Sequence, residues 1–347
     1  MNKSLTLSFK ALITAVALSL LALQLTSCSQ PAEAIKISGP TMGTRYNITL
    51  FPEKDAPLVP QNLQKSINAS LQNINQQMST YIKDSEISRF NQTQSTDWFS
   101  VSAEFVEVVE AAQKISQLSQ GAFDITIGPL INMWGFDKDF KNNNPDQATI
   151  DAALANMGYQ KLEVRTNPPA LRKQIPQLQI NLSAIAKGYA VDLIAKQLAE
   201  QGIQNYLVEI GGEIRANGVK FNGDLWRIAI EKPSTKERAI QRGILLNNVA
   251  VATSGDYRNY FERDGKRYSH TINPATGKPI THQLASITIL HPSTMMADGL
   301  ATAIMVLGEE KGKAFISDNA LQGYMISRDK DNFSVWNNFP DETFIKP

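Results

Sequence analysis

The sequence lacks an excess of charge, a pair of cysteines and any common nucleotide-binding loop. Its 347 residues include one cysteine, so no disulfide can form within the chain, and an oxidising compartment poses no obstacle to folding. The formal net charge of +1 gives no reason to expect nucleic acid or an anionic membrane surface as a partner. The chain has no GxGxxG motif, no Walker loop and no segment that repeats at a fixed period.

The remaining composition is that of a globular protein with an ample core. Hydrophobic residues make up 42% of the chain and charged residues 19%. A chain of this length can form one large domain or two closely joined ones.

The first 28 residues differ in pattern from the rest of the chain. Lys3 and Lys10 precede an apolar run over residues 11–23, which is too short to span a membrane comfortably. The run leads to Leu25-Thr-Ser-Cys28, which resembles the lipobox of bacterial lipoproteins, where the chain is cut before the cysteine and the thiol is acylated. We predict a signal peptide over 1–27, lipidation of Cys28 and a tether over 28–36. An ordinary secretory signal is the alternative.

Hydrophobic spacing predicts an order of elements typical of α+β proteins. Several predicted strands follow one another with no helix between them, which favours this class over a doubly wound sheet. Residues 37–51 are expected to form two strands around a bend at 39–44. The other predicted strands cover 178–182, 206–210, 225–230, 249–253 and 284–290, and the predicted helices cover 61–78, 102–119, 146–157, 184–201 and 298–307.

Two segments near the C-terminus carry the most informative polar residues. His270, one of three histidines, precedes an Asn-Pro turn. Asp298 and Thr302 are four residues apart on a predicted helix, so their oxygen atoms share one face. A carboxylate and a hydroxyl placed in this way suit a hard cation that holds a phosphate. Taken singly, His270 could be a loop histidine, Asp298 a helix N-cap and Thr302 a back-bonded helix threonine.

Further glycine-rich or polar segments occur where a plain core would not need them. Residues 181–192 open a helix directly after a predicted strand, where free amides and the helix dipole favour an anion. Lys187 lies in the first turn of this helix, against the preference of the dipole, which points to contact with a phosphate; a solvated surface lysine is the alternative. The other segments cover 42–44, 121–124, 128–136, 207–213 and 253–257.

These segments, in this order, resemble the FAD:protein FMN transferase family, often called ApbE, over essentially the whole chain from Met42 to about Gly308. The resemblance implies an α+β fold of the ApbE type, with 37–347 as one catalytic unit. It implies that the protein binds FAD and Mg²⁺ and attaches FMN through a phosphoester to a threonine or serine of an acceptor protein, releasing AMP. The implied acceptors are membrane subunits of redox complexes or other exported flavoproteins.

The resemblance also implies roles for individual residues. His270 matches the catalytic candidate of the family. Asn181 stands where many members have aspartate, and its amide keeps a hydrogen-bond acceptor but lacks the negative charge of a base or a direct metal ligand. The implied metal ligands are Asp298, the Thr302 hydroxyl and the carbonyl oxygen of Ala184. The implied FAD contacts are Met42, Tyr81, Ala122, Phe123, Asp124, Asn181, Lys187 and Ile272.

Two other functions use the same residues. Water in place of a protein hydroxyl would make the chain an FAD pyrophosphatase, and a chain without catalysis would be a flavin-binding lipoprotein. A pure binder would not need His270, Asp298 and Thr302 together, which argues against the second alternative.

The predicted location is the periplasmic side of the bacterial cell envelope, with a lipid anchor at Cys28. Family resemblance favours the inner membrane. Ser29 is not the aspartate associated with inner-membrane retention, so the outer membrane stays an alternative.

Overall fold

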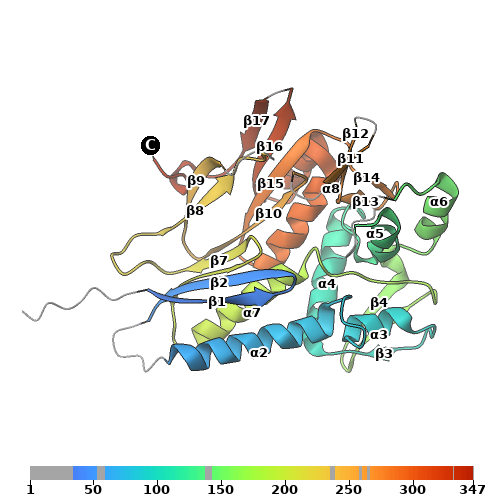
Figure 1. Cartoon of the computed structure of the whole chain (residues 1–347), viewed down its shortest axis with the longest axis horizontal. Coiled ribbons are helices and arrows are strands. Elements are labelled where there is room, and N and C mark those ends of the chain that lie inside the picture. The colour runs from blue at the N-terminus through green and yellow to red at the C-terminus, as the bar shows by residue number, and fades with distance from the viewer. Residues whose placement is uncertain are drawn as a thin grey trace, which may run out of the picture. The chain divides into compact units, whose positions relative to one another are not determined.

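The largest element of the structure is an eight-stranded sheet in which every neighbouring pair is antiparallel (Figure 1). The computed structural model describes residues 34–52, 59–136, 143–234, 239–257, 260–263, 266–330 and 332–346, so the predicted signal peptide and Cys28 lie outside the described residues. In sheet order, the strands are β1 (Ile35–Thr41), β2 (Thr44–Phe51), β6 (Asn205–Ile210), β7 (Glu213–Asn217), β10 (Val249–Gly255), β15 (Leu284–His291), β16 (Gln322–Asp329) and β17 (Asn332–Asn337).

Apolar side chains cover both faces of this sheet. Ile289 of β15 and Met325 of β16 belong to a core cluster shared with the helices, whereas their neighbours Leu290 and Ile326 belong to a second cluster. Because successive residues of a strand point to opposite faces, the two clusters lie on opposite sides of the sheet. The first contains residues of α2 (Pro60–Met78), α4 (Ala103–Leu118), α7 (Ala186–Glu200) and α8 (Thr294–Asp318), and the second contains residues of β8 (Trp226–Glu231) and β9 (Ile240–Leu246).

Several helices begin where a short polar side chain satisfies a free amide. Ser102 accepts from the amide of Phe105 at the start of α4, and Asp146 accepts from that of Thr149 at the start of α6 (Gln147–Ala155). The predicted helices over 61–78, 102–119, 146–157 and 184–201 agree with the structure to within two residues. The helix predicted over 298–307 is longer, because it begins after Ser293 and continues past a break in the helical backbone at Gly308.

Smaller helices and strands complete the structure. The helices are α3 (Glu86–Gln92), α5 (Gly128–Trp134), η1 (Ile125–Ile127), η2 (Tyr159–Lys161) and η3 (Asp341–Thr343). The short strands are β3 (Phe99–Ser100), β4 (Leu162–Thr166), β5 (Pro169–Lys173), β11 (Tyr260–Arg263), β12 (Lys266–Ser269), β13 (Ile272–Asn273) and β14 (Lys278–Pro279). Within the described ranges, no helix is both long enough and apolar enough to span a membrane.

The strand predicted over 178–182 is wrong, because this segment is irregular. A side chain takes the place of a neighbouring strand: the Asn91 amide group donates to the carbonyl of Ile180 and accepts from its N–H, both at 2.8 Å. The N–H of Asn181 donates to the carbonyl of Ile125 at 2.7 Å. Buried Leu178, Ile180 and Leu182 alternate with polar residues as in a half-buried strand, but the contacts of Asn91 and Ile125 take the place of a sheet.

A buried lysine fixes the same segment from its other side. Lys173, at the end of β5, is 1% exposed, and its ammonium donates to the carbonyl oxygens of Thr93, Pro176 and Leu178 at 2.7, 3.1 and 3.1 Å. It therefore joins the end of α3 to the chain that leads into α7.

Replacing Lys173 with methionine is expected to lower the free energy of unfolding by about 3 kcal/mol, since three carbonyls, that of Leu178 in a fully buried contact, lose their shared donor. Chemical denaturation measures this change. Lys65→Met, at an exposed position of α2, is the matched control and should stay within about 0.5 kcal/mol of the wild type. A Lys173→Met protein as stable as the control would contradict this role for the lysine.

Candidate active site

A cavity of about 680 Å³ lies where β6, β7 and β10 meet the start of α7 and the first turns of α8. A volume of this size is typical of small-molecule and cofactor sites. Its walls come from segments that are far apart in the sequence. Of the site residues predicted from the sequence, the cavity is lined by Ala122, Phe123, Asp124, Asn181, Ala184, Lys187, His270, Ile272, Asp298 and Thr302.

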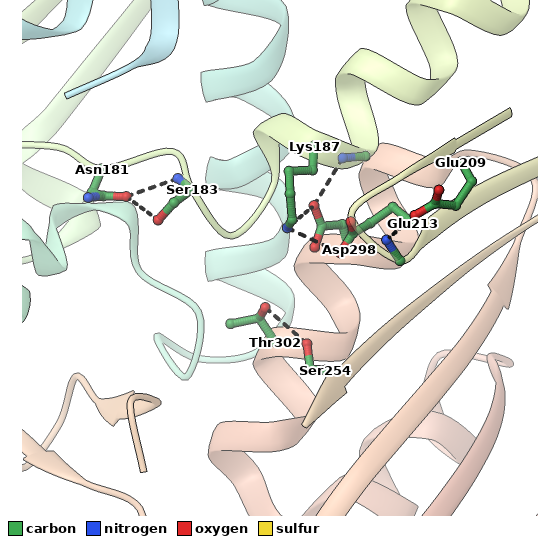
Figure 2. A network of polar contacts seen from close by, with 10 residues as sticks. Asn181, Ser183, Lys187, Glu209, Glu213, Ser254, Asp298 and Thr302 are labelled. Atoms are coloured by element: carbon green, nitrogen blue, oxygen red, sulfur yellow. Dashed lines mark hydrogen bonds and ion pairs between the residues drawn. The ribbon is translucent and has the colours of Figure 1, made fainter. Parts of the chain in front are cut away.

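Asp298 is a buried carboxylate inside α8. Ser293 caps this helix by accepting from the amide of Met296, so Asp298 lies beyond the first turn and is not its N-cap. The carboxylate is 4% exposed and accepts from the amide of Gly188 at 3.0 Å (Figure 2). A side chain at Gly188 would come within 2.4 Å of the carbonyl oxygen of Thr294, so glycine is needed where α7 and α8 meet.

Thr302 lies one helical turn beyond Asp298 and faces the same cavity. Its hydroxyl is 3.3 Å from the hydroxyl of Ser254 on β10 (Figure 2). The predicted sharing of one helix face by Asp298 and Thr302 therefore agrees with the structure, and Ser254 adds a further oxygen atom that the sequence analysis did not single out.

Lys187 joins two carboxylates across the cavity wall. Its ammonium lies 3.1 Å from Glu213 and 3.8 Å from Asp298, and its side chain is 26% exposed (Figure 2). Burial disfavours the ammonium ion, but the carboxylates of Asp298 and Glu213 outweigh it and raise the lysine pKa above its usual value. The alternative of a solvated surface lysine is therefore wrong.

Glu213 is the residue of this group that the sequence analysis did not identify. It lies at the start of β7 and is 4% exposed, and burial raises its pKa even though the Lys187 ammonium opposes the shift. The segment 207–213 stands out in the sequence for its two glycines, but nothing in it shows which lysine the glutamate would meet. Only the pairing of β6 with β7 and the packing of α7 bring the two charges together.

Asp124 and Asn181 shape the loops that line the opposite wall. Asp124 accepts from the amide and the hydroxyl of Thr126 at 2.8 and 2.7 Å and from the amide of Tyr159 at 3.0 Å. Burial raises the pKa of Asp124 against these hydrogen bonds. The side-chain oxygen of Asn181 accepts from both the amide and the hydroxyl of Ser183. Asparagine thus supplies the acceptor that this turn needs without adding a negative charge.

Met42, Tyr81 and His270 differ in where the structure places them. His270 lies in the chain between β12 and β13 and lines the cavity. Met42 lies in the turn between β1 and β2 with φ of 48° and packs against the main core, and Tyr81 is 53% exposed. Neither Met42 nor Tyr81 is among the residues that line the cavity, so the structure gathers most but not all of the predicted FAD contacts.

The oxygen donors of the cavity fit a hard divalent cation. Asp298 offers a carboxylate, Thr302 a hydroxyl, and Ala184, which lines the same cavity, a backbone carbonyl. Magnesium prefers oxygen ligands and uses few carboxylates. In the part of the chain that is described, no group of three or more His, Cys, Asp or Glu could hold a metal, so a cation here would depend on this mixed set.

The fold and the cavity together define an α+β protein whose oxygen donors and ammonium suit a cation and a phosphate-bearing ligand. The sequence model of the ApbE family matches residues 42–325, and the chain belongs to this family. The FAD:protein FMN transferase of Vibrio cholerae is 47% identical over 315 residues, which are 90% of this chain and 93% of the relative. The enzyme of the same name from Haemophilus influenzae is 43% identical over 329 residues, which are 93% of this chain and 95% of the relative.

Solved structures agree with this assignment. The flavin transferase ApbE from Vibrio cholerae has a TM-score of 0.81 at 45% identity and covers 88% of this chain and 97% of its own. The apo form of the flavinyl transferase ApbE from Pseudomonas stutzeri has the same TM-score at 40% identity and covers 88% of this chain and 94% of its own. The family and the α+β fold class predicted from the sequence are confirmed.

Proposed function

We propose that the protein is an FAD:protein FMN transferase, which moves FMN from FAD to a threonine or serine hydroxyl of an acceptor protein and releases AMP. One observation supports this most strongly: Lys187, His270, Asp298 and Thr302, from three separate segments, line one cavity. The names of the relatives agree with it. A cavity of about 680 Å³ is also large enough for much of a dinucleotide.

Each of these cavity residues has a separate role in the proposed phosphoryl transfer. The acceptor oxygen attacks the phosphorus on the riboflavin side of FAD, the bond to the bridging oxygen breaks, and AMP leaves with that oxygen. Asp298, Thr302 and the Ala184 carbonyl would hold Mg²⁺, which when bound would neutralise charge on the phosphate oxygens. The Lys187 ammonium places a second positive charge beside them. His270 accepts the proton that the attacking hydroxyl loses.

An FAD pyrophosphatase is the second candidate, because water could reach the same phosphorus. Co-expression with a candidate acceptor, followed by in-gel flavin fluorescence, separates the two. A transferase leaves flavin bound to the acceptor after denaturation. A pyrophosphatase releases FMN and AMP and leaves the acceptor without flavin fluorescence.

We also propose that the mature protein is attached by lipid at Cys28 to the periplasmic side of the cell envelope, at the inner membrane. The basic start, the apolar run over 11–23 and the Leu-x-Ser-Cys pattern support this. The sheet begins at Ile35, so the tether is short. FAD and an exported acceptor would meet the enzyme at this surface.

Cys28→Ser should abolish acylation, since Cys28 is the only thiol in the chain. Metabolic labelling with palmitate and fractionation of the envelope measure the effect, and the variant should leave the membrane fraction. Label that persists on the Cys28→Ser protein would contradict the lipoprotein assignment.

A further inference from the structure

Glu213 is a buried carboxylate in the cavity for which the reaction as described above has no use. One of its oxygens, Oε1, lies 3.1 Å from the Lys187 ammonium. The other, Oε2, is buried and finds no hydrogen-bond partner among the described residues. Burying a carboxylate oxygen without a hydrogen-bond partner costs free energy, so we expect Glu213 to have a role in the site that offsets this cost.

Lys187 is shared between Glu213 and Asp298. The ammonium is closer to Glu213, at 3.1 Å, than to Asp298, at 3.8 Å (Figure 2). Asp298 Oδ2, the oxygen nearest the ammonium, also accepts from the amide of Gly188. When both carboxylates are ionised, they and the one ammonium carry a formal charge of −1, which favours the entry of a cation.

The backbone between β6 and β7 holds this arrangement in place. Gly211 has φ of 64°, and a side chain there would come within 2.9 Å of the Thr44 methyl group, 3.4 Å of Lys187 Cδ and 3.5 Å of Glu213 Oε2. The turn therefore packs closely against both charged side chains. Glycine suits it on two grounds, since the positive φ and the space both disfavour a larger residue.

A cation that binds Asp298 must compete with Lys187 for the same carboxylate. If Asp298 were the only partner of the ammonium, the cation would leave a partly buried positive charge unpaired beside it. Glu213 removes this conflict because the lysine keeps an ion pair at 3.1 Å whichever ion Asp298 binds.

We propose that Glu213 is a positioning residue: it holds the Lys187 ammonium beside the phosphate site and leaves Asp298 to the cation. This rests on the proposed function, which places Mg²⁺ on Asp298. In this arrangement one cavity presents both a divalent cation and an ammonium to the two phosphates. Glu213 itself contacts neither the cation nor the phosphorus.

A double-mutant cycle measured by calorimetric titration with MgCl₂ alone tests the proposal. Glu213→Gln keeps the shape of the side chain but removes its charge, and it should weaken Mg²⁺ binding by about 10–100-fold, as changes next to metal ligands typically do. Lys187→Gln removes the competing ammonium and should bind Mg²⁺ at least as tightly as the wild type. In the Lys187→Gln background, Glu213→Gln should cost only a few-fold.

If Glu213→Gln weakened Mg²⁺ binding equally in the wild-type and Lys187→Gln backgrounds, the proposal would be overturned, because Glu213 would then act on the cation and not through the lysine. Unchanged binding in Glu213→Gln would overturn it too, as would a wild type that binds no Mg²⁺. Glu163→Gln, which breaks an ion pair with Arg172 between β4 and β5, is the matched control and should bind like the wild type. The titration contains no FAD or acceptor, so an enzyme that fails to modify acceptors would contradict the proposed function and not this cycle.

Discussion

Replacing His270 with alanine is expected to lower FMN transfer by about 10²–10⁴-fold, the contribution typical of a positioned general base. Binding of FAD and Mg²⁺ should change little, because the cation is assigned to oxygen ligands and the phosphate charge to Mg²⁺ and Lys187. His270 lines the cavity, so its ring can reach a hydroxyl that enters from the acceptor. A flavin titration and a single-turnover transfer assay on the same variant separate binding from chemistry.

Added imidazole provides the control for this variant. It should restore part of the transfer to His270→Ala, since it can occupy the space of the lost ring. Lost FAD affinity would make His270 a binding residue, and unchanged transfer would remove it from the mechanism.

Replacing Asp298 should weaken Mg²⁺ binding and transfer together. Changes to residues that only support metal ligands cost about 10–100-fold, so we expect about 100-fold or more from a charged ligand. Asp298→Asn is more informative than Asp298→Ala, because the amide can still accept from the N–H of Gly188 and so preserve the contact between α7 and α8. Mg²⁺ dependence of the transfer rate is the measurement.

Two results would contradict the assignment of Asp298 as a Mg²⁺ ligand. Transfer that stays normal at low Mg²⁺ would mean that the cation binds elsewhere. If an Asp298 variant lost transfer but bound Mg²⁺ as tightly as the wild type, Asp298 would have a structural role in α8. Its carboxylate already accepts one backbone N–H, that of Gly188.

Local patterns predicted the elements whose signals are local. The spacing of Leu63, Ile67 and Leu71 predicted α2, and all three are buried. The four-residue spacing of Asp298 and Thr302 predicted that both would face one site, and both line the cavity. These features depend on helix geometry, which a sequence displays directly.

Elements set by distant contacts were missed or misread. β16 is buried on both faces, so it shows no alternation, and β17 is a largely exposed edge strand. Residues 178–182 resemble a buried strand, but Asn91 and Ile125, from other parts of the chain, satisfy their backbone. The ion pair of Lys187 with Glu213 was missed for the same reason, since it exists only after α7 packs against the sheet.

A transferase and a pyrophosphatase differ in where the FMN of FAD goes: to an acceptor protein or into solution. The most direct test incubates the purified enzyme with FAD, Mg²⁺ and an acceptor, and then quantifies AMP together with the modified acceptor peptide by mass spectrometry. We expect equal amounts of AMP and of a peptide that carries FMN on a threonine or serine. AMP and free FMN with an unmodified acceptor would contradict the transferase assignment.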